Sequence, residues 1–141
     1  MPSIFTHIIE GRMPGHFVWK DEVCVAFLTI APLKPGHTLV VPRQEVEAWT
    51  DLEPEGMQHL TRVAQSIARA LDRIYRPEKV GLTILGLEVP HVHLHVSCIW
   101  SPHDLDFGRA DTKASQASLA EAAGKLRMAL RELGHREVAD A

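Results

Sequence analysis

Three histidines stand at alternate positions in this sequence: His91, His93 and His95, separated by Val92 and Leu94. Imidazole titrates at about pH 6.5, so it can act as base, acid or nucleophile near neutral pH. A histidine nitrogen that attacks phosphorus forms a covalent phospho-histidine, which divides one difficult displacement into two easier ones. Neighbouring imidazoles that hold protons stabilise the phosphoryl oxygens and the leaving group. The spacing therefore predicts nucleotide or phosphate chemistry.

The same cluster is compatible with a metal site. His-x-His on a strand is a common pair of zinc or iron ligands. Such a site needs a third ligand, for which His95, His37 and Glu88 are candidates. A structural or merely adhesive cluster is the third interpretation, and the residues alone leave all three open.

A strand must position these histidines. Their spacers are aliphatic throughout, and alternation of this kind indicates a strand from His91 to Trp100. Side chains two residues apart share one face of a strand, so the three imidazoles should form a row. His37 begins another predicted strand after Pro35-Gly36, and antiparallel pairing would bring it to the same face.

The remaining pattern predicts an α+β fold in which an antiparallel sheet of about five strands carries packed helices. Helices are expected at 3–11, at about 54–76, where Pro77 ends the run, and from a capping box at 118–121 to Gly134, after which the tail frays. Strands are expected at 16–20, 23–30, 37–41, 80–85 and 91–100, and 101–118 is expected to be a loop.

Composition narrows the class of protein. The 141 residues suit one domain spanning 1–141. A net charge of −3 argues against a nucleic-acid partner, and no segment approaches the ~20 apolar residues of a membrane span. The two cysteines, Cys24 and Cys98, are expected to be buried thiols in a reducing compartment. A soluble cytoplasmic protein is predicted.

The motif and its flanking segments resemble the histidine-triad (HIT) family, in its Hint-like branch. The resemblance extends from about residue 3 to residue 100, with Ser97 where the family usually has a hydrophobic residue. It is carried by the segments 4–5, 8–11, 25–30, 35–42 and 91–96. It implies a HIT-like fold and a homodimer.

The family resemblance also implies an activity. The chain would be a hydrolase or transferase that cleaves a nucleoside 5′-monophosphate from a phosphoramidate or a related P–N or P–O linked substrate. His93 would be the nucleophile, and His95 would contact the phosphate and help to protonate the leaving group. His91 and His37 would orient the site. The mechanism requires no metal or other cofactor.

The resemblance further implies a pocket for a purine nucleotide. The base would contact apolar residues, and the phosphate would be held by backbone N–H groups near Gly86 and Leu87. The predicted substrate-binding residues are Phe5, Ile8, Phe27, Thr29, Ile30, Gly86, Leu87 and Glu88, with Leu39 beside them. Phe5, Ile8 and Ile30 would serve equally well as core residues. The histidines other than His37 and those of the motif are expected on the solvated surface. These are His7, His16, His59, His103 and His135.

Several positions depart from the family pattern. Ser3 and Thr6 replace the Cys-x-x-Cys of many zinc-containing bacterial members, and Glu45 stands near the place of a further histidine, so no zinc site of that type is expected. Thr29 replaces an aspartate that holds the ribose, and a hydroxyl binds more weakly than a carboxylate. Glu88 stands where the family has a small phosphate-contacting residue, so it could select a cationic leaving group or ligate a metal.

Two alternatives to the enzyme remain. One is a metal-binding protein or metalloenzyme that uses the histidine cluster with Glu88. The other is a catalytically weak nucleotide-binding module that senses a nucleotide or scaffolds a partner.

Overall fold

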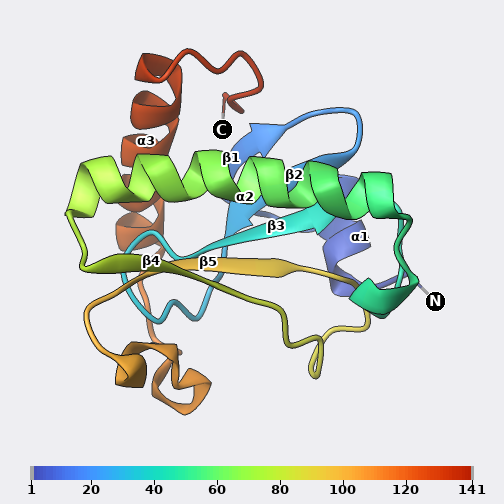
Figure 1. Cartoon of the computed structure of the whole chain (residues 1–141), viewed down its shortest axis with the longest axis horizontal. Coiled ribbons are helices and arrows are strands. Elements are labelled where there is room, and N and C mark those ends of the chain that lie inside the picture. Colours follow the sequence, from blue (N-terminus) through green and yellow to red (C-terminus); the bar gives the residue numbers. More distant parts are fainter. Residues whose placement is uncertain (1, 141) are drawn as a thin grey trace.

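A single five-stranded sheet organises the chain, whose computed structural model describes residues 2–140 (Figure 1). Its strands are β1 (Phe17–Lys20), β2 (Cys24–Leu28), β3 (Thr38–Pro42), β4 (Lys79–Thr83) and β5 (Leu94–Ile99). They lie in the order β1-β2-β3-β5-β4, and every neighbouring pair is antiparallel. The predicted α+β class and the number of strands are confirmed.

Helices cover both faces of this sheet (Figure 1). They are α1 (Ile4–Ile9), α2 (Pro54–Tyr75) and α3 (Gln116–Glu132), with the short 3₁₀ turns η1 (Trp49–Asp51), η2 (Pro102–Leu105) and η3 (Phe107–Arg109). α2 and α3 bury their apolar sides against alternate residues of the strands, such as Ala26 and Val40. The intervening residues, such as Val25 and Leu39, face Phe5 of α1. The alternation of strand side chains thus divides the core into two layers.

α2 begins and ends where the sequence predicts. Pro54 occupies the first turn, where its missing N–H costs no hydrogen bond. The helix ends at Tyr75, and the next residue, Arg76, caps it: Arg76 adopts a left-handed conformation with φ 51° and donates its N–H to Asp72 O. Near this end of α2, Gly36 has φ +86°, and an added Cβ would lie 2.7 Å from Leu71 Cδ2. Only glycine fits this turn, and His37 follows it directly.

The strand that carries the histidine motif begins later than predicted. β5 starts at Leu94, so His91, Val92 and His93 precede it. Val92 N–H donates to Val46 O, on a loop outside the sheet, instead of to a strand. The inward–outward alternation nevertheless continues through this segment, because Val92 and Leu94 are both fully buried on the α2 side.

Two predictions for the C-terminal part are wrong. α3 starts at Gln116, and its cap is Ser115, whose hydroxyl accepts from the N–H of Ser118; Ser118 itself lies inside the helix. The tail does not fray. Lys20 N–H donates to Glu137 O, and Ala139, which is only 5% exposed, donates its N–H to Val18 O. These hydrogen bonds pair backbone groups at the edge of β1 that would otherwise lack partners in the sheet. Local sequence patterns do not predict such a contact between distant segments.

Both cysteines are free and buried, as predicted. Between residues 2 and 140, no helix is at once long enough and apolar enough to cross a membrane.

Candidate active site

The motif histidines lie on the sheet face that α1 covers. His91 and His93 are buried and His95 is half-buried. The Phe5 ring packs edge-on against both His91 and His93, with centroid distances of 5.9 and 4.8 Å. His93 and His95 are neighbours with a centroid distance of 4.8 Å. The predicted row of imidazoles is therefore present.

Backbone groups fix the tautomer of His93. Its Nδ1 lies 2.7 Å from His91 O, a carbonyl that can only accept. Nδ1 must therefore carry the proton, which leaves the lone pair of the neutral ring on Nε2. A ring held in this way presents a nucleophilic nitrogen in a fixed orientation.

A second chain of hydrogen bonds fixes His37 and His95. Leu33 N–H donates to His37 Nδ1 over 3.0 Å, so His37 carries its proton on Nε2. His37 Nε2 in turn donates to His95 Nδ1 over 3.0 Å. Neutral His95 then holds its proton on Nε2, where it can donate to a ligand. Antiparallel pairing of β3 with β5 brings the two residues together, as the sequence predicts.

His91 is held by groups to which the sequence assigned no catalytic part. Its Nε2 donates to Pro42 O over 2.7 Å, so its Nδ1 accepts from the Ser3 hydroxyl, also over 2.7 Å. Glu45 accepts from both Ser3 N–H and the Thr6 hydroxyl, each over 2.6 Å. Both ring nitrogens of His91 are occupied, which makes it a positioning residue.

Burial keeps these imidazoles neutral. It lowers the pKa of His37 to about 3 and that of His95 to about 4, and in both cases neighbouring histidines lower the pKa further. The pKa of His93 is also lowered by burial, although its bond to His91 O and the Glu88 carboxylate partly oppose this. The ring of Phe107 in η3 packs 4.8 Å from that of His95 and helps to exclude water.

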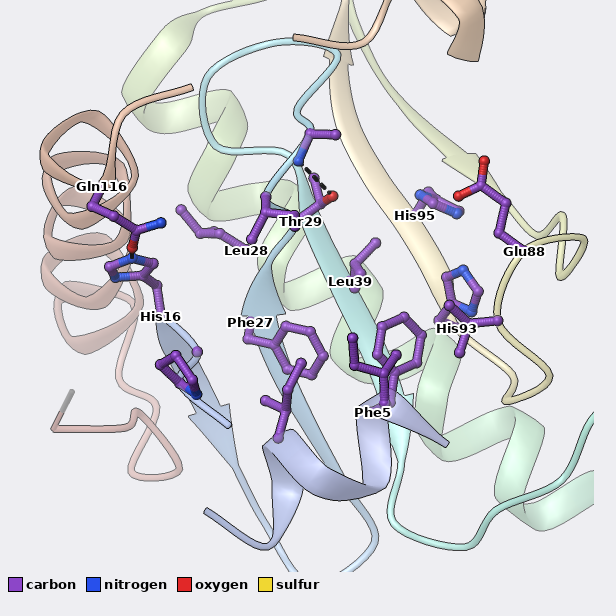
Figure 2. Close-up of a pocket in the computed structure, with 17 residues that line it drawn as sticks. Phe5, His16, Phe27, Leu28, Thr29, Leu39, Glu88, His93, His95 and Gln116 are labelled. Carbon is purple, nitrogen blue, oxygen red and sulfur yellow. Dashed lines mark hydrogen bonds between the residues drawn. The ribbon is translucent and has the colours of Figure 1, made fainter. Parts of the chain in front are cut away.

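A cavity of about 420 Å³ extends from His93 and His95 across the apolar face (Figure 2). This volume is within the range of small-molecule sites. Its walls are mainly apolar, and they include Ile4, Phe5, Ile8, Phe27, Leu28, Ile30, Leu39 and Val89. Phe5 and Phe27 contact each other edge to face, with centroids 5.6 Å apart.

The structure brings together most of the predicted substrate-binding residues. Thr29 lines the cavity, and its hydroxyl accepts from Ala31 N–H over 3.1 Å. Ile30 also lines it but is 73% exposed, so the alternative of a core residue is wrong. Glu88 lies at the histidine end of the cavity (Figure 2). Gly86 and Leu87 are not among the described residues that line it, and Leu87 is 87% exposed.

The opposite end of the cavity holds two residues that the sequence did not single out. His16, expected on the solvated surface, is half-buried and lines the cavity together with Gln116 from the first turn of α3. His16 Nε2 lies 2.8 Å from Gln116 Oε1. No local sequence pattern predicts this contact, because 100 residues separate His16 from Gln116. His59, also expected on the solvated surface, is half-buried, and its Nε2 lies 2.7 Å from Asp21 Oδ2.

Metal-ligating side chains converge elsewhere. Within residues 2–140, the one group of three such side chains whose ligand atoms lie within 4.8 Å of one another is Asp21, Cys24 and His59. Both Asp21 oxygens there already accept hydrogen bonds, from Trp19 and from the backbone of Cys24 among others. The cluster closes the β1–β2 turn onto α2.

Ser3, the N-cap of α1, and Thr6 within it stand where the resemblance stated from the sequence places zinc-binding cysteines, and they do not fit that ion. Zinc in proteins takes thiolate, imidazole or carboxylate ligands, whereas Ser3 and Thr6 supply hydroxyls. The one carboxylate, Glu45, is occupied by its hydrogen bonds to Ser3 and Thr6, which lower its pKa to about 2. A hydrogen-bonded network thus joins α1 to His91.

The fold and site together define an α+β protein with alternate histidines at the mouth of an apolar cavity. Residues 10–98 match the HIT domain family. Protein hit of Bacillus subtilis is 30% identical over 135 residues, which cover 84% of this chain and 92% of that protein. An uncharacterized HIT-like protein of Borreliella burgdorferi is 35% identical over 100 residues, which cover 66% and 72% of the two chains.

A solved structure resembles the whole fold. A zinc-bound histidine triad family protein from Mycobacterium smegmatis is 29% identical, with a TM-score of 0.79 over 92% of this chain and 94% of that one. The chain belongs to the HIT family, and the resemblance stated from its motif is confirmed.

Proposed function

We propose that this HIT protein is a nucleotide-binding enzyme that releases a nucleoside 5′-monophosphate from a phosphoramidate or a related P–N or P–O linked substrate. The observation that carries the proposal is the fixed tautomer of His93. The bond from Nδ1 to His91 O leaves the Nε2 lone pair available, and the ring lines a cavity of suitable size. A solved histidine triad protein from Sulfolobus tokodaii with the same fold is described as nucleotide-binding.

The reaction would proceed in two displacements. His93 Nε2 attacks the α-phosphorus, and the bond from phosphorus to the leaving group breaks, with its electron pair going to the leaving atom. Water then attacks the phosphorus of the nucleotidyl-histidine and gives up a proton to His95, which donated one to the first leaving group. The bond to Nε2 breaks with its electron pair returning to His93, and the nucleoside monophosphate is released. Throughout, the Nδ1 proton and its bond to His91 O stabilise the positive charge that develops on the ring.

His95 would supply the hydrogen bond and the proton that the leaving group needs. In the free protein burial keeps it neutral, with Nε2–H as donor. A bound phosphate places negative charge beside the ring and favours its protonated form. His37, which carries its own proton on Nε2, would hold His95 in position while His95 is neutral, because protonated His95 would turn a second N–H toward the Nε2–H of His37.

The apolar walls would hold the base and Thr29 the ribose. The Thr29 hydroxyl already accepts from Ala31 N–H and has one hydrogen left to donate, so its grip on the ribose would be modest. We also propose that the protein forms a homodimer.

The two alternatives have less support. A metal bound by the motif would compete with hydrogen bonds that occupy both nitrogens of His91 and Nδ1 of His93. A binding module without catalysis would need no nucleophile with an ordered tautomer. Turnover measurements separate both from the enzyme.

The deciding experiment is hydrolysis of adenosine 5′-phosphoramidate in the presence of a chelator. We expect the wild type to release AMP and His93→Ala to lose at least about a hundredfold in kcat, because the nucleophile is absent. His103→Ala is the matched control, since His103 does not line the cavity. Turnover that depends on added metal would support the metalloenzyme instead. AMP binding without turnover would support the binding module.

A further inference from the structure

The cavity has two chemically different ends. His93, His95 and Glu88 lie at one end, and His16 and Gln116 lie at the other (Figure 2). Between them the rings of Phe5 and Phe27 and the side chain of Leu39 form an apolar floor. A nucleotide whose phosphate contacts His93 would therefore direct its base along this floor toward His16 and Gln116. This expectation depends on the function proposed above.

The backbone that carries Gln116 is fixed by contacts of α3 with its own cap and with β1. The cap at Ser115 fixes the start of α3, and Arg127 of the same helix donates to Phe17 O over 2.6 Å. α3 is thereby joined to β1, whose first residue follows His16 directly. The two residues of the pair consequently belong to elements that are fixed relative to each other.

The bond to His16 orients the amide. Gln116 Oε1 can only accept, so His16 Nε2 carries the proton and donates to it over 2.8 Å. One lone pair of Oε1 and both hydrogens of the amide nitrogen remain available. This arrangement offers an acceptor and a donor side by side.

Adenine is the purine that matches this pattern. Its exocyclic N6 amino group donates and N7 accepts, and a glutamine amide binds both at once. Guanine and hypoxanthine present O6 at the same edge, and this oxygen would face Oε1 with like partial charge. Two acceptors facing each other in this way would weaken the binding of guanine and hypoxanthine relative to adenine.

We propose that Gln116, oriented by His16, reads the edge of the nucleobase and makes the cavity selective for adenine nucleotides over those of hypoxanthine and guanine. Gln116 lies outside the segment 10–98 that matches the HIT domain family, so the selectivity would be a property of the C-terminal helix of this chain.

The test is a calorimetric titration of the full-length protein with AMP, IMP and GMP. AMP and IMP differ at the 6-position of the base. We expect AMP to bind about tenfold more tightly than IMP in the wild type, in line with a bidentate amide contact. Gln116→Leu should bring the ratio close to one by weakening AMP. Gln65→Leu, an exposed change on α2 away from this cavity, should leave the ratio unchanged.

His16→Phe provides a second variant that keeps an aromatic ring but cannot orient the amide. We expect it to reduce the AMP preference as well. Equal binding of AMP and IMP by the wild type, or a ratio that Gln116→Leu does not alter, would overturn the inference and leave the proposed function standing. Failure of all three nucleotides to bind, together with no turnover of the phosphoramidate, would overturn both.

Discussion

At the scale of single residues, hydrogen bonds to groups with fixed polarity determine what each histidine can do. His91 O and Leu33 N–H are backbone groups, and each dictates the proton position on the ring it contacts. The result is one imidazole with a free lone pair, His93, and one with an outward proton, His95. The two share a residue type and lie on the same face, and they differ in chemistry because the Nδ1 atoms of their rings have different hydrogen-bond partners.

The first residue-scale prediction concerns the pH dependence of turnover. The nucleophile must be neutral, and the pKa of His93 is lowered by burial while the Glu88 carboxylate partly opposes this shift. As the pH is lowered, kcat/KM should therefore begin to fall only at a pH below 6.5, the ordinary pKa of histidine.

Glu88→Gln should move the acid limb of this profile to lower pH, because the imidazolium of His93 loses a stabilising charge. Glu47→Gln, which removes an exposed carboxylate that does not line the cavity, is the control and should not move it. A profile that is identical in wild type and Glu88→Gln would mean that Glu88 does not influence His93.

The second residue-scale prediction concerns Ser97. It is 1% exposed, and its hydroxyl has no hydrogen-bond partner among residues 2–140. Since a buried hydroxyl without a partner is destabilising, Ser97→Ala should raise the free energy of unfolding by about 1 kcal/mol. Urea denaturation measures this. Ser66→Ala, which removes a buried hydroxyl that donates to Arg62 O, should give no such gain.

At the scale of secondary-structure elements, the site depends on where helices begin and strands pair. α1 brings Phe5 over the histidines, the pairing of β3 with β5 brings His37 to His95, and α3 brings Gln116 to the far end of the cavity. The sequence predicted α1 and the two strands, because their apolar periodicity is regular. It misplaced the cap of α3, because Ser115 and Ser118 are both plausible cap residues and only the tertiary fold decides which one ends the preceding loop.

A stability measurement checks this cap. Ser115→Ala should lower the free energy of unfolding by about 1 kcal/mol, because the N–H of Ser118 loses its acceptor. Ser118→Ala should cost less, since Ser118 lies within the first turn and alanine favours helices. Equal losses in the two variants would contradict the assignment of Ser115 as the cap.

At the scale of the whole molecule, the two edges of the sheet differ. The edge at β1 is paired with the C-terminal tail through the bridge between Trp19 and Val138. The other edge, β4, has no strand beside it within residues 2–140, and it carries Leu82, which is 53% exposed. An edge strand presents unpaired backbone N–H and C=O groups, and an exposed leucine adds apolar surface, so β4 could pair with another chain. This is consistent with the proposed homodimer.

Sedimentation equilibrium tests that dimer. We expect the wild type to be dimeric at micromolar concentration and Leu82→Glu to shift it toward monomer, because a charge would be placed in an apolar interface. Met128→Glu changes an exposed apolar residue on α3, away from β4, and should leave the dimer intact. A wild type that is monomeric at all concentrations would disprove the homodimer.

The sequence by itself determined the fold class, the nucleophile candidate and the family, because alternation of side chains and a run of three histidines are local patterns. Tertiary structure decided the tautomers, the contact of Ser3 with His91 and the pairing of His16 with Gln116. These contacts join residues that lie 88 and 100 positions apart, and no local periodicity encodes them. The tail was misjudged for the same reason, since the hydrogen bonds that order Ala139 come from β1, at the other end of the chain.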